Sequence, residues 1–243
     1  MTKSLHSKGI AFPKAVSWQV FDSISSRYDL LNHLLSFGLD FRWRKRLKDF
    51  LPSQDNQLLL DVACGTGDVL IVLVQENPRI AKAYGIDLAK KMLGYAQRKV
   101  ERKGLQGKIQ LRHGDAQEIP FPEKTFDTVT IAFGIRNIEN PIFVLKEMYR
   151  VLKNKGKVLI LEFSLPENFL LRTGHLIYLK TIVPLLGGMI SGHFKAYRYL
   201  NQTIERFPYG EQFRRMMEQV GFHRVQAHPL AGGIACIYEG EKP

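Results

Sequence analysis

The stretch Leu58–Asp68, LLLDVACGTGD, sets the architecture of this chain of 243 residues. It begins as an apolar run broken by one aspartate, which is typical of a strand buried on both faces of a parallel sheet. The glycines that follow, Gly65 and Gly67, allow a tight turn and a close approach of the backbone to a ligand. A helical pattern starts directly afterwards, so the free N–H groups of that helix N-terminus would lie beside the turn. The stretch therefore predicts a strand, a ligand-binding turn and a helix.

The alternation of strands and helices continues along the chain. Further strands are expected at Ala83–Asp87, Ile109–His113, Phe126–Phe133 and Lys157–Phe163. Helices are expected after the glycine turn up to Gln75, at Lys90–Lys103 and at Pro141–Leu152. This alternation predicts an α/β fold, a Rossmann-like and mostly parallel sheet with helices on both faces. Near the C-terminus we expect helices around Tyr197–Arg206 and Glu211–Val220, then an antiparallel pair of strands at Arg224–His228 and Ile234–Tyr238.

The length suits a single domain over residues 1–243. Two segments interrupt the alternation, an N-terminal helical cap at residues 14–50 and an apolar insertion at residues 165–195. The most apolar part of the insertion, Leu176–Ile190, is shorter than the ~20 residues of a membrane span, and Lys180 and Pro184 interrupt it. The N-terminus contains no long apolar run, so no signal peptide is expected. These features predict a cytoplasmic protein that does not cross a membrane.

The composition is that of a globular protein, with 45% hydrophobic and 24% charged residues, and it excludes a wholly disordered or fibrous chain. The net charge of +12 indicates an anionic partner. The charge alone does not distinguish between nucleic acid, acidic lipid and a phosphorylated substrate. The two cysteines, Cys64 and Cys236, are too few for a disulfide scaffold or a structural zinc site. The histidines show no metal-ligand spacing, so we expect no metal.

Acidic residues around the glycine turn indicate which cofactor it binds. Asp87, at the end of the second strand, is placed to accept the hydroxyls of a ribose. A dinucleotide fingerprint needs a third glycine at position 70, where this chain has Leu70. Asp61, on the first strand, would repel a pyrophosphate but can orient a cationic amino acid group. These features favour S-adenosylmethionine, and Asp115 and Ala116 after the third strand would contact its adenine.

Four longer, gapped motifs span nearly the whole chain. They are YDLLN at residues 28–32 with Ser36, Asp40 and Trp43; FGIRN at residues 133–137; RVLK at residues 150–153 with Gly156, Glu162 and Ser164; and YRYL at residues 197–200 with Phe207 and Pro208. With these motifs the chain resembles the ubiquinone/menaquinone biosynthesis C-methyltransferase family, which belongs to the class I S-adenosylmethionine-dependent methyltransferases. Asp40 stands where the family signature has a histidine, so no role of that histidine is carried over.

The resemblance implies a cofactor, a reaction and a substrate. It implies that Thr66, Asp87, Asp115 and Ala116 hold S-adenosylmethionine. It further implies methylation of a ring carbon of a prenylated quinol, with demethylmenaquinol as the first candidate and a benzoquinol of ubiquinone synthesis as the alternative. The apolar insertion would then hold the prenyl tail, although it could equally be additional core.

The expected reaction needs a group that helps a quinol lose a proton. The loop after the fourth strand lies at the carboxyl edge of the sheet, where open α/β sheets bind ligands. There Arg136 could stabilise a quinolate or position a water, and Asn137 could bind a quinol oxygen. Tyr28 and Asn32 could close over the ring. The simpler alternatives are a half-buried aromatic for Tyr28 and a surface or helix-capping role for Arg136.

Several alternatives stay open at this point. A basic run could dock on anionic lipid or form an ordinary solvated face; its residues are Arg42, Arg44, Lys45, Arg46 and Lys48. The basic charge also suits an RNA methyltransferase, although no basic domain is appended. A non-catalytic subunit that only binds the cofactor is a third reading, which the departure at Asp40 keeps open. The oligomeric state is not determined by the sequence.

Overall fold

The computed structural model describes His33, Ser36 and residues 38–185 and 203–243. In this part of the chain, seven strands form one sheet in the order β3-β2-β1-β4-β5-β7-β6. The strands are β1 (Gln57–Val62), β2 (Ile80–Asp87), β3 (Ile109–His113), β4 (Phe126–Ala132), β5 (Leu152–Phe163), β6 (His223–Leu230) and β7 (Ala235–Glu241). Strands β1 to β5 are parallel, whereas β7 is antiparallel to both β5 and β6. The predicted fold class and the antiparallel pair are confirmed.

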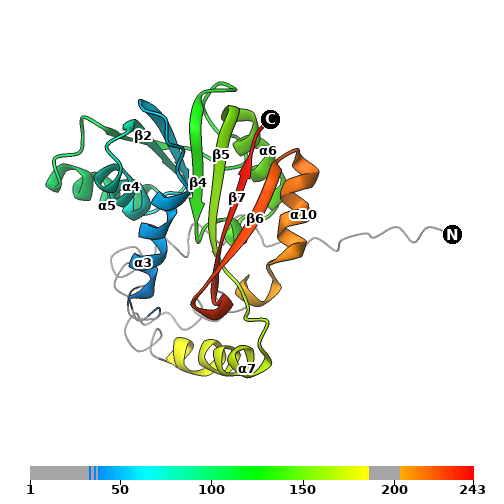
Figure 1. Cartoon of the computed structure of the whole chain (residues 1–243). Coiled ribbons are helices and arrows are strands. Elements are labelled where there is room, and N and C mark those ends of the chain that lie inside the picture. The colour runs from blue at the N-terminus through cyan, green and yellow to red at the C-terminus, as the bar shows by residue number, and fades with distance from the viewer. Residues whose placement is uncertain (1–32, 34–35, 37, 186–202) are drawn as a thin grey trace.

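Helices flank this sheet, as Figure 1 shows. The α-helices are α3 (Leu39–Arg46), α4 (Asp68–Glu76), α5 (Lys90–Arg102), α6 (Pro141–Val151), α7 (Phe169–Ile177) and α10 (Glu211–Val220). Short helical turns are η1 (Leu47–Phe50), η2 (Ile135–Asn137), the π-helical η3 (Tyr178–Ile182) and η4 (Ala231–Gly233). None of the described helices combines the length and apolar character that crossing a membrane requires.

The predicted element ranges agree with the structure except at a few ends. Strand β2 starts earlier than expected, at Ile80, whose side chain is fully buried. Strand β5 also starts earlier, because Leu152 pairs with Phe126 ahead of an irregularity in the register. Of the predicted helical cap, residues 14–32 lie outside the described residues, as do residues 186–195 of the predicted insertion and residues 197–202 of a predicted helix.

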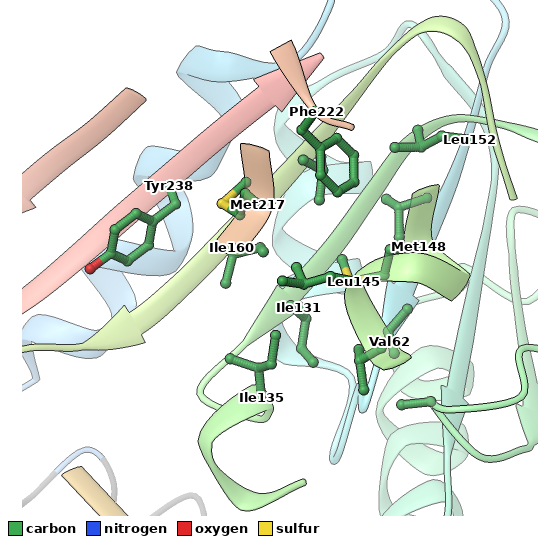
Figure 2. Packing of buried hydrophobic residues seen from close by; sticks show 14 of the residues in the cluster. Val62, Ile131, Ile135, Leu145, Met148, Leu152, Ile160, Met217, Phe222 and Tyr238 are labelled. Carbon is green, nitrogen blue, oxygen red and sulfur yellow. The ribbon is translucent and has the colours of Figure 1, made fainter. Parts of the chain in front are cut away.

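Two apolar layers cover the two faces of the sheet, and β1 contributes to both. Leu60 and Val62 belong to the layer that includes residues of α6 and α10, part of which is shown in Figure 2. Leu59 belongs to the opposite layer, together with residues of α3 and α4. Successive residues of a strand point to opposite faces, so a strand covered on both sides needs an unbroken apolar run. This explains the apolar residues of LLLDV, whereas the one buried polar residue among them, Asp61, is hydrogen-bonded to Thr130.

A third glycine at position 70 would allow α4 to pack closely on the sheet. In this chain Gly85 of β2 provides the space for that contact instead. Leu70 of α4 is fully buried, and a Cβ added at Gly85 of β2 would lie 2.6 Å from its Cδ1. The same Cβ would lie 2.8 Å from Cys64 Sγ and 2.8 Å from Leu111 Cδ2. The missing side chain of Gly85 therefore creates the space in which Leu70 packs. Close packing of α4 on the sheet is kept although position 70 is not a glycine.

We expect Gly85→Ala to destabilise the fold by about 1–3 kcal/mol, because the added methyl group overpacks the contact with Leu70. Denaturant unfolding followed by circular dichroism measures this change. The matched control is Gly94→Ala in α5, where an added Cβ meets no atom within 4 Å. The control should stabilise the helix by about 0.5–1 kcal/mol. Equal stabilities of the two variants would contradict the role given to Gly85.

Candidate active site

A cavity lies at the carboxyl ends of β1, β2, β3 and β4, and we call it the cofactor cavity. It encloses about 800 Å³, part of which is open to solvent. Its lining is Ala63, Gly65, residues 87–89, Met92, residues 114–117, residues 132–134 and residues 137–139. The connection after β1 leads to β2 on one side and the connection after β4 leads to β5 on the other side. The cavity therefore occupies the switch point at which α/β sheets bind ligands.

The two glycines of the turn have different tasks. Gly65 has a φ of +55° and lines the cavity, and an added Cβ would meet no atom within 4 Å. Gly67 has a φ of +80° and precedes α4, and an added Cβ would lie 3.1 Å from Ala96 Cβ in α5. Gly65 thus leaves room for a ligand, whereas Gly67 allows two helices to approach. Neither Gly67 nor the buried Thr66 lines the cavity, so their contact with the cofactor stays a prediction.

Asp87 holds the turn and the second strand together. The Gly65 N–H donates a hydrogen bond to Asp87 Oδ2 at 2.8 Å, and the Ala89 N–H donates to Oδ1 at 2.8 Å. These bonds fix the plane of the carboxylate at the cavity wall. Because a carboxylate oxygen can accept more than one hydrogen bond, ribose hydroxyls can be bound in addition. The structure thus brings Gly65 and Asp87 into the same site, as the sequence predicted.

Asp115 and Ala116 line the cavity as well. Asp115 Oδ1 accepts a hydrogen bond from the Gln117 N–H at 2.9 Å, which orients its carboxylate. Leu88 and Met92 provide apolar surface for a flat ring in the same cavity. The position predicted for the adenine therefore adjoins the position predicted for the ribose.

Asp61 lies beneath the turn and outside the cavity lining. Its Oδ1 accepts a hydrogen bond from Thr130 Oγ1 at 2.6 Å. Burial raises the pKa of Asp61 to about 7, and the charge of Asp87 also raises it. A cation in the cavity would favour the ionised form of Asp61. Its predicted direct contact with the cofactor stays a prediction.

The FGIRN loop contains a buried ion pair that the sequence did not reveal. Arg136 Nη1 donates to Glu162 Oε1 at 2.5 Å and to the Phe133 carbonyl oxygen at 2.7 Å. Both partners are buried, with Arg136 4% exposed and Glu162 0%. Burial raises the pKa of Glu162, and the charge of Arg136 opposes this shift. The surface and helix-capping alternatives for Arg136 are therefore wrong, and its charge holds the loop against β5.

Asn137 lines the cavity, as do Phe133 and Gly134 of the same loop. Its Nδ2 donates to the Phe133 carbonyl oxygen at 3.2 Å, while its buried Oδ1 has no hydrogen-bond partner among the described residues. A buried acceptor of this kind is suited to a donor group on a ligand. Arg136 does not line the cavity, so its contact with the substrate remains a prediction. Tyr28 and Asn32 lie outside the described residues.

The unusual Asp40 is the centre of a buried polar cluster. It accepts hydrogen bonds from Arg44 and from Ser36 Oγ at 2.7 Å, and His33 Nδ1 lies 2.6 Å from its Oδ2. The charge of Arg44 and these hydrogen bonds lower the pKa of Asp40 despite the opposing effect of burial. Since Arg44 is buried, it cannot belong to a lipid-docking surface, and that part of the sequence-based hypothesis is wrong. Two other residues of the basic run, Lys45 and Lys48, form ion pairs with Glu76.

A second cavity, which we call the apolar groove, lies between α3, α7, η3 and the segment before β7. It encloses about 1120 Å³ including open solvent, and its lining is Ser36, Leu39, Trp43, Phe163, Leu170, Leu171, Gly174, His175, Tyr178, Leu179, Val183, Ile204, Ala231 and Ile234. Helix α7 begins where Asn168 Oδ1 accepts hydrogen bonds from the Leu170 and Leu171 N–H groups, as a capping residue does.

Trp43, Phe133 and Phe163 form an aromatic wall between the two cavities. Phe133 lines the cofactor cavity, and Phe163 and Trp43 line the apolar groove. The ring centroids of Phe133 and Phe163 are 4.6 Å apart, and Trp43 lies 6.2 Å and 6.1 Å from them. These packed rings thus lie between a cavity with acidic lining residues and a mostly apolar groove.

Solved structures with a similar fold include methyltransferases. One is a Thermotoga maritima S-adenosylmethionine-dependent methyltransferase described as a possible histamine N-methyltransferase, with a TM-score of 0.66, 18% identity, and coverage of 93% of this chain and 100% of that one. Another is an Aquifex aeolicus S-adenosylmethionine-dependent methyltransferase, with a TM-score of 0.57, 22% identity, and coverage of 82% and 88%. The sheet order, the glycine turn and the strand-end acids define a class I S-adenosylmethionine-dependent methyltransferase.

The chain belongs to the ubiE/COQ5 methyltransferase family, whose model matches residues 12–242. A demethylmenaquinone methyltransferase of Thermus thermophilus is 42% identical over 224 residues, which are 92% of this chain and 100% of that protein. The ubiquinone/menaquinone biosynthesis C-methyltransferase UbiE of Geotalea daltonii is also 42% identical over 224 residues, which are 92% of this chain and 95% of that protein. The resemblance stated from the motifs is therefore confirmed.

The residues of the cofactor cavity fit the donor of this class. S-adenosylmethionine supplies a methyl group on a cationic sulfur. The charged residues that line the cavity are all acidic, namely Asp87, Asp115 and Glu139. Such a lining suits a cationic donor and would repel a pyrophosphate. Asp87 would hold the ribose, Asp115 and Ala116 the adenine, and Gly65 would leave room for the donor beside the turn.

We expect Asp87→Asn to weaken S-adenosylmethionine binding by about 10- to 100-fold, because two charge-assisted hydrogen bonds to the ribose become weaker. Isothermal titration calorimetry measures the dissociation constant. The control is Asp68→Asn, since Asp68 pairs with Lys99 outside the cavity lining. An equal loss of affinity in both variants would show that Asp87 has no special place in the site.

Proposed function

We propose that this chain transfers a methyl group to a ring carbon of a prenylated quinol, with demethylmenaquinol as the first candidate acceptor. The observation that carries the proposal is the apolar groove behind the aromatic wall of the cofactor cavity. An acceptor with an aromatic head and an isoprenoid tail needs such a pair of adjoining sites. The relatives named demethylmenaquinone methyltransferase and UbiE support the same class of acceptor. A benzoquinol of ubiquinone synthesis is the alternative acceptor.

The chemistry of the reaction selects the reduced ring. A quinone ring is poor in electrons, whereas the oxygens of a quinol donate electrons to the ring carbon that is methylated. Asn137 offers its unpartnered Oδ1 to a quinol hydroxyl from the cavity side. Arg136 holds the backbone that carries Asn137, and its positive charge would favour a quinolate nearby. Tyr28 is proposed to close over the ring, as the motif suggests.

We expect the purified chain to methylate reduced demethylmenaquinone with S-adenosylmethionine and not to methylate transfer or ribosomal RNA. Product is detected by mass spectrometry with isotopically labelled methyl donor under anaerobic conditions. A short-tailed benzoquinol in a parallel reaction distinguishes the two ring types. Methylation of RNA alone would favour the RNA methyltransferase. Donor binding without transfer to any of these acceptors would favour the non-catalytic subunit.

We also propose that the protein contacts an anionic membrane through α7, so that its acceptor can enter from the bilayer. Helix α7 lies away from the sheet in Figure 1, and none of its residues is buried. Phe169 and Leu170 are 75% and 78% exposed, and Leu171 and Ile177 are also exposed. Residues 169–185 contain Arg172 and Lys180 but no acidic residue. Leu170 and Leu171 also line the groove, so its opening would face the lipid.

We expect the double variant Phe169→Ser/Leu170→Ser to lose sedimentation with vesicles of phosphatidylglycerol and phosphatidylcholine, because exposed apolar area drives insertion at the interface. The wild-type chain should sediment with these vesicles. The control is Phe143→Ser in α6, since Phe143 is 51% exposed on another helix. Equal sedimentation of wild type and both variants would refute contact through α7.

A further inference from the structure

The FGIRN loop contributes one side-chain amide to the lining of the cofactor cavity, and the orientation of this amide is fixed. Asn137 lines the cavity and is 6% exposed. Its Nδ2 donates to the Phe133 carbonyl oxygen at 3.2 Å. A carbonyl oxygen only accepts hydrogen bonds, so the amide nitrogen must be the atom that meets it. The buried Oδ1 has no partner among the described residues, so Asn137 keeps an acceptor, and not a donor, for a ligand.

The carbonyl group of Phe133 is itself held in place from two sides. Arg136 Nη1 donates to its oxygen at 2.7 Å and to Glu162 Oε1 at 2.5 Å. The N–H of Phe133 donates to the Leu161 carbonyl oxygen at 2.8 Å. Phe133 also has a φ of +55°, a left-handed conformation that bulky residues rarely adopt. Such a backbone persists only where its surroundings enforce it, so β5 and Arg136 together fix the group that orients Asn137.

The loop has no easy way to offer a side-chain donor at this position instead. A half-turn of the Asn137 amide would break the hydrogen bond to Phe133 and would set two acceptor oxygens against each other, which is costly in a buried site. Arg136 Nε is a buried donor without a partner among the described residues, but Arg136 does not line the cavity. The acceptor of Asn137 is therefore the side-chain polar group that this loop presents to a ligand.

The other polar side chains of the cavity reinforce this preference. The polar lining consists of Asp87, Asp115, Gln117, Asn137 and Glu139. Ionised carboxylates only accept hydrogen bonds, so three of these five side chains offer no donor. The amide of Gln117 follows Asp115, on the side assigned to the adenine. A ligand group close to Asn137 and Glu139 therefore meets side-chain acceptors, and it needs a donor of its own.

We propose that Asn137 makes the site selective for the reduced state of the acceptor, an inference that rests on the function proposed above. A quinol carries O–H donors, whereas the corresponding quinone carries carbonyl oxygens that only accept. Asn137 Oδ1 accepts a hydrogen bond from the quinol hydroxyl but opposes the quinone oxygen with a second acceptor. A binding site built for a hydroxyl group rejects an analogue without one, because its buried acceptor stays unpaired. The redox state is thus selected at binding, before methyl transfer.

The first test measures binding without turnover. Short-tailed demethylmenaquinone, either oxidised or reduced with dithionite, is dialysed to equilibrium under anaerobic conditions against the chain and S-adenosylhomocysteine. The wild type should bind the quinol about 10- to 100-fold more tightly than the quinone. Asn137→Leu, which keeps the side-chain volume, and Asn137→Ala, which adds no bulk, should both lose this preference. The loss should come from weaker binding of the quinol, because its hydroxyl no longer has an acceptor.

The matched control is Asn140→Leu, the same substitution three residues further on. Asn140 precedes α6, makes no capping hydrogen bond with its side chain and does not line the cavity. This variant should keep the wild-type ratio of the two dissociation constants. The affinity for S-adenosylhomocysteine, measured by calorimetry, should stay close to the wild-type value in all three variants, which shows that each is folded around an intact cavity.

The second test uses the quinone as an inhibitor of the methylation of the quinol. For the wild type, the inhibition constant of the quinone should exceed the KM of the quinol by about 10-fold or more. In Asn137→Leu the two constants should approach each other, because the KM of the quinol rises while the inhibition constant of the quinone does not. A variant that only perturbed packing would weaken the binding of both forms and would leave their ratio unchanged.

The outcomes separate this selectivity from the proposed function. A wild-type chain that methylates the quinol but binds both redox forms equally well would overturn the selectivity alone. A wild-type preference that persists in both Asn137 variants would overturn the role of Asn137. A wild-type chain that transfers no methyl group to a naphthoquinol or a benzoquinol would overturn the proposed function itself.

Discussion

The hydrogen bond from the Gly65 N–H to the carboxylate of Asp87 is the contact on which the site depends. It joins the turn after β1 to the end of β2, and the second oxygen of Asp87 receives the N–H of Ala89 just before α5. Three elements therefore meet at one carboxylate, beside the switch point between β1 and β4. A ligand held by Asp87 would lie close to the glycine turn, because Gly65 is hydrogen-bonded to Asp87 and both line the same cavity. The strand-end acid thus organises the turn, in addition to the donor-binding role that we propose for it.

The charge of the whole chain and the charge of the cofactor cavity have opposite signs. The net charge is +12, yet the charged lining residues are acidic, and the buried Asp61 adds a further carboxyl beneath the turn. Part of the basic charge is used within the protein, since Arg136 and Arg44 are buried against Glu162 and Asp40. A cationic methyl donor is therefore compatible with a basic protein. Net charge describes the surface and association of a protein, whereas local charge decides what a cavity binds.

The aromatic wall gives the two cavities a common boundary with different chemistry on each side. Arg44 lies over the ring of Phe133 at 5.6 Å, and Arg136 lies over the ring of Phe163 at 5.0 Å. Each arginine is paired with an acid, so the wall is packed between two fixed ion pairs. Under the proposed function, this partition gives the donor and the prenyl tail separate surroundings on the two sides of the wall. Helix α7 completes the apolar side, and its exposed residues extend that side to the surface.

The sequence by itself determined the α/β architecture, the glycine turn, and the grouping of Gly65, Asp87, Asp115 and Ala116, because periodicity and turn chemistry are local and because parallel strand ends meet at one edge. The gapped motifs determined the family. Only the tertiary structure decided that Gly85 makes room for Leu70, that Arg136 pairs with Glu162, and that His175 faces an apolar groove. These contacts join residues far apart in the chain, such as Arg136 and Glu162, and no local pattern encodes which of them will meet. Burial and packing, which set the protonation and orientation of each group, follow from that long-range arrangement.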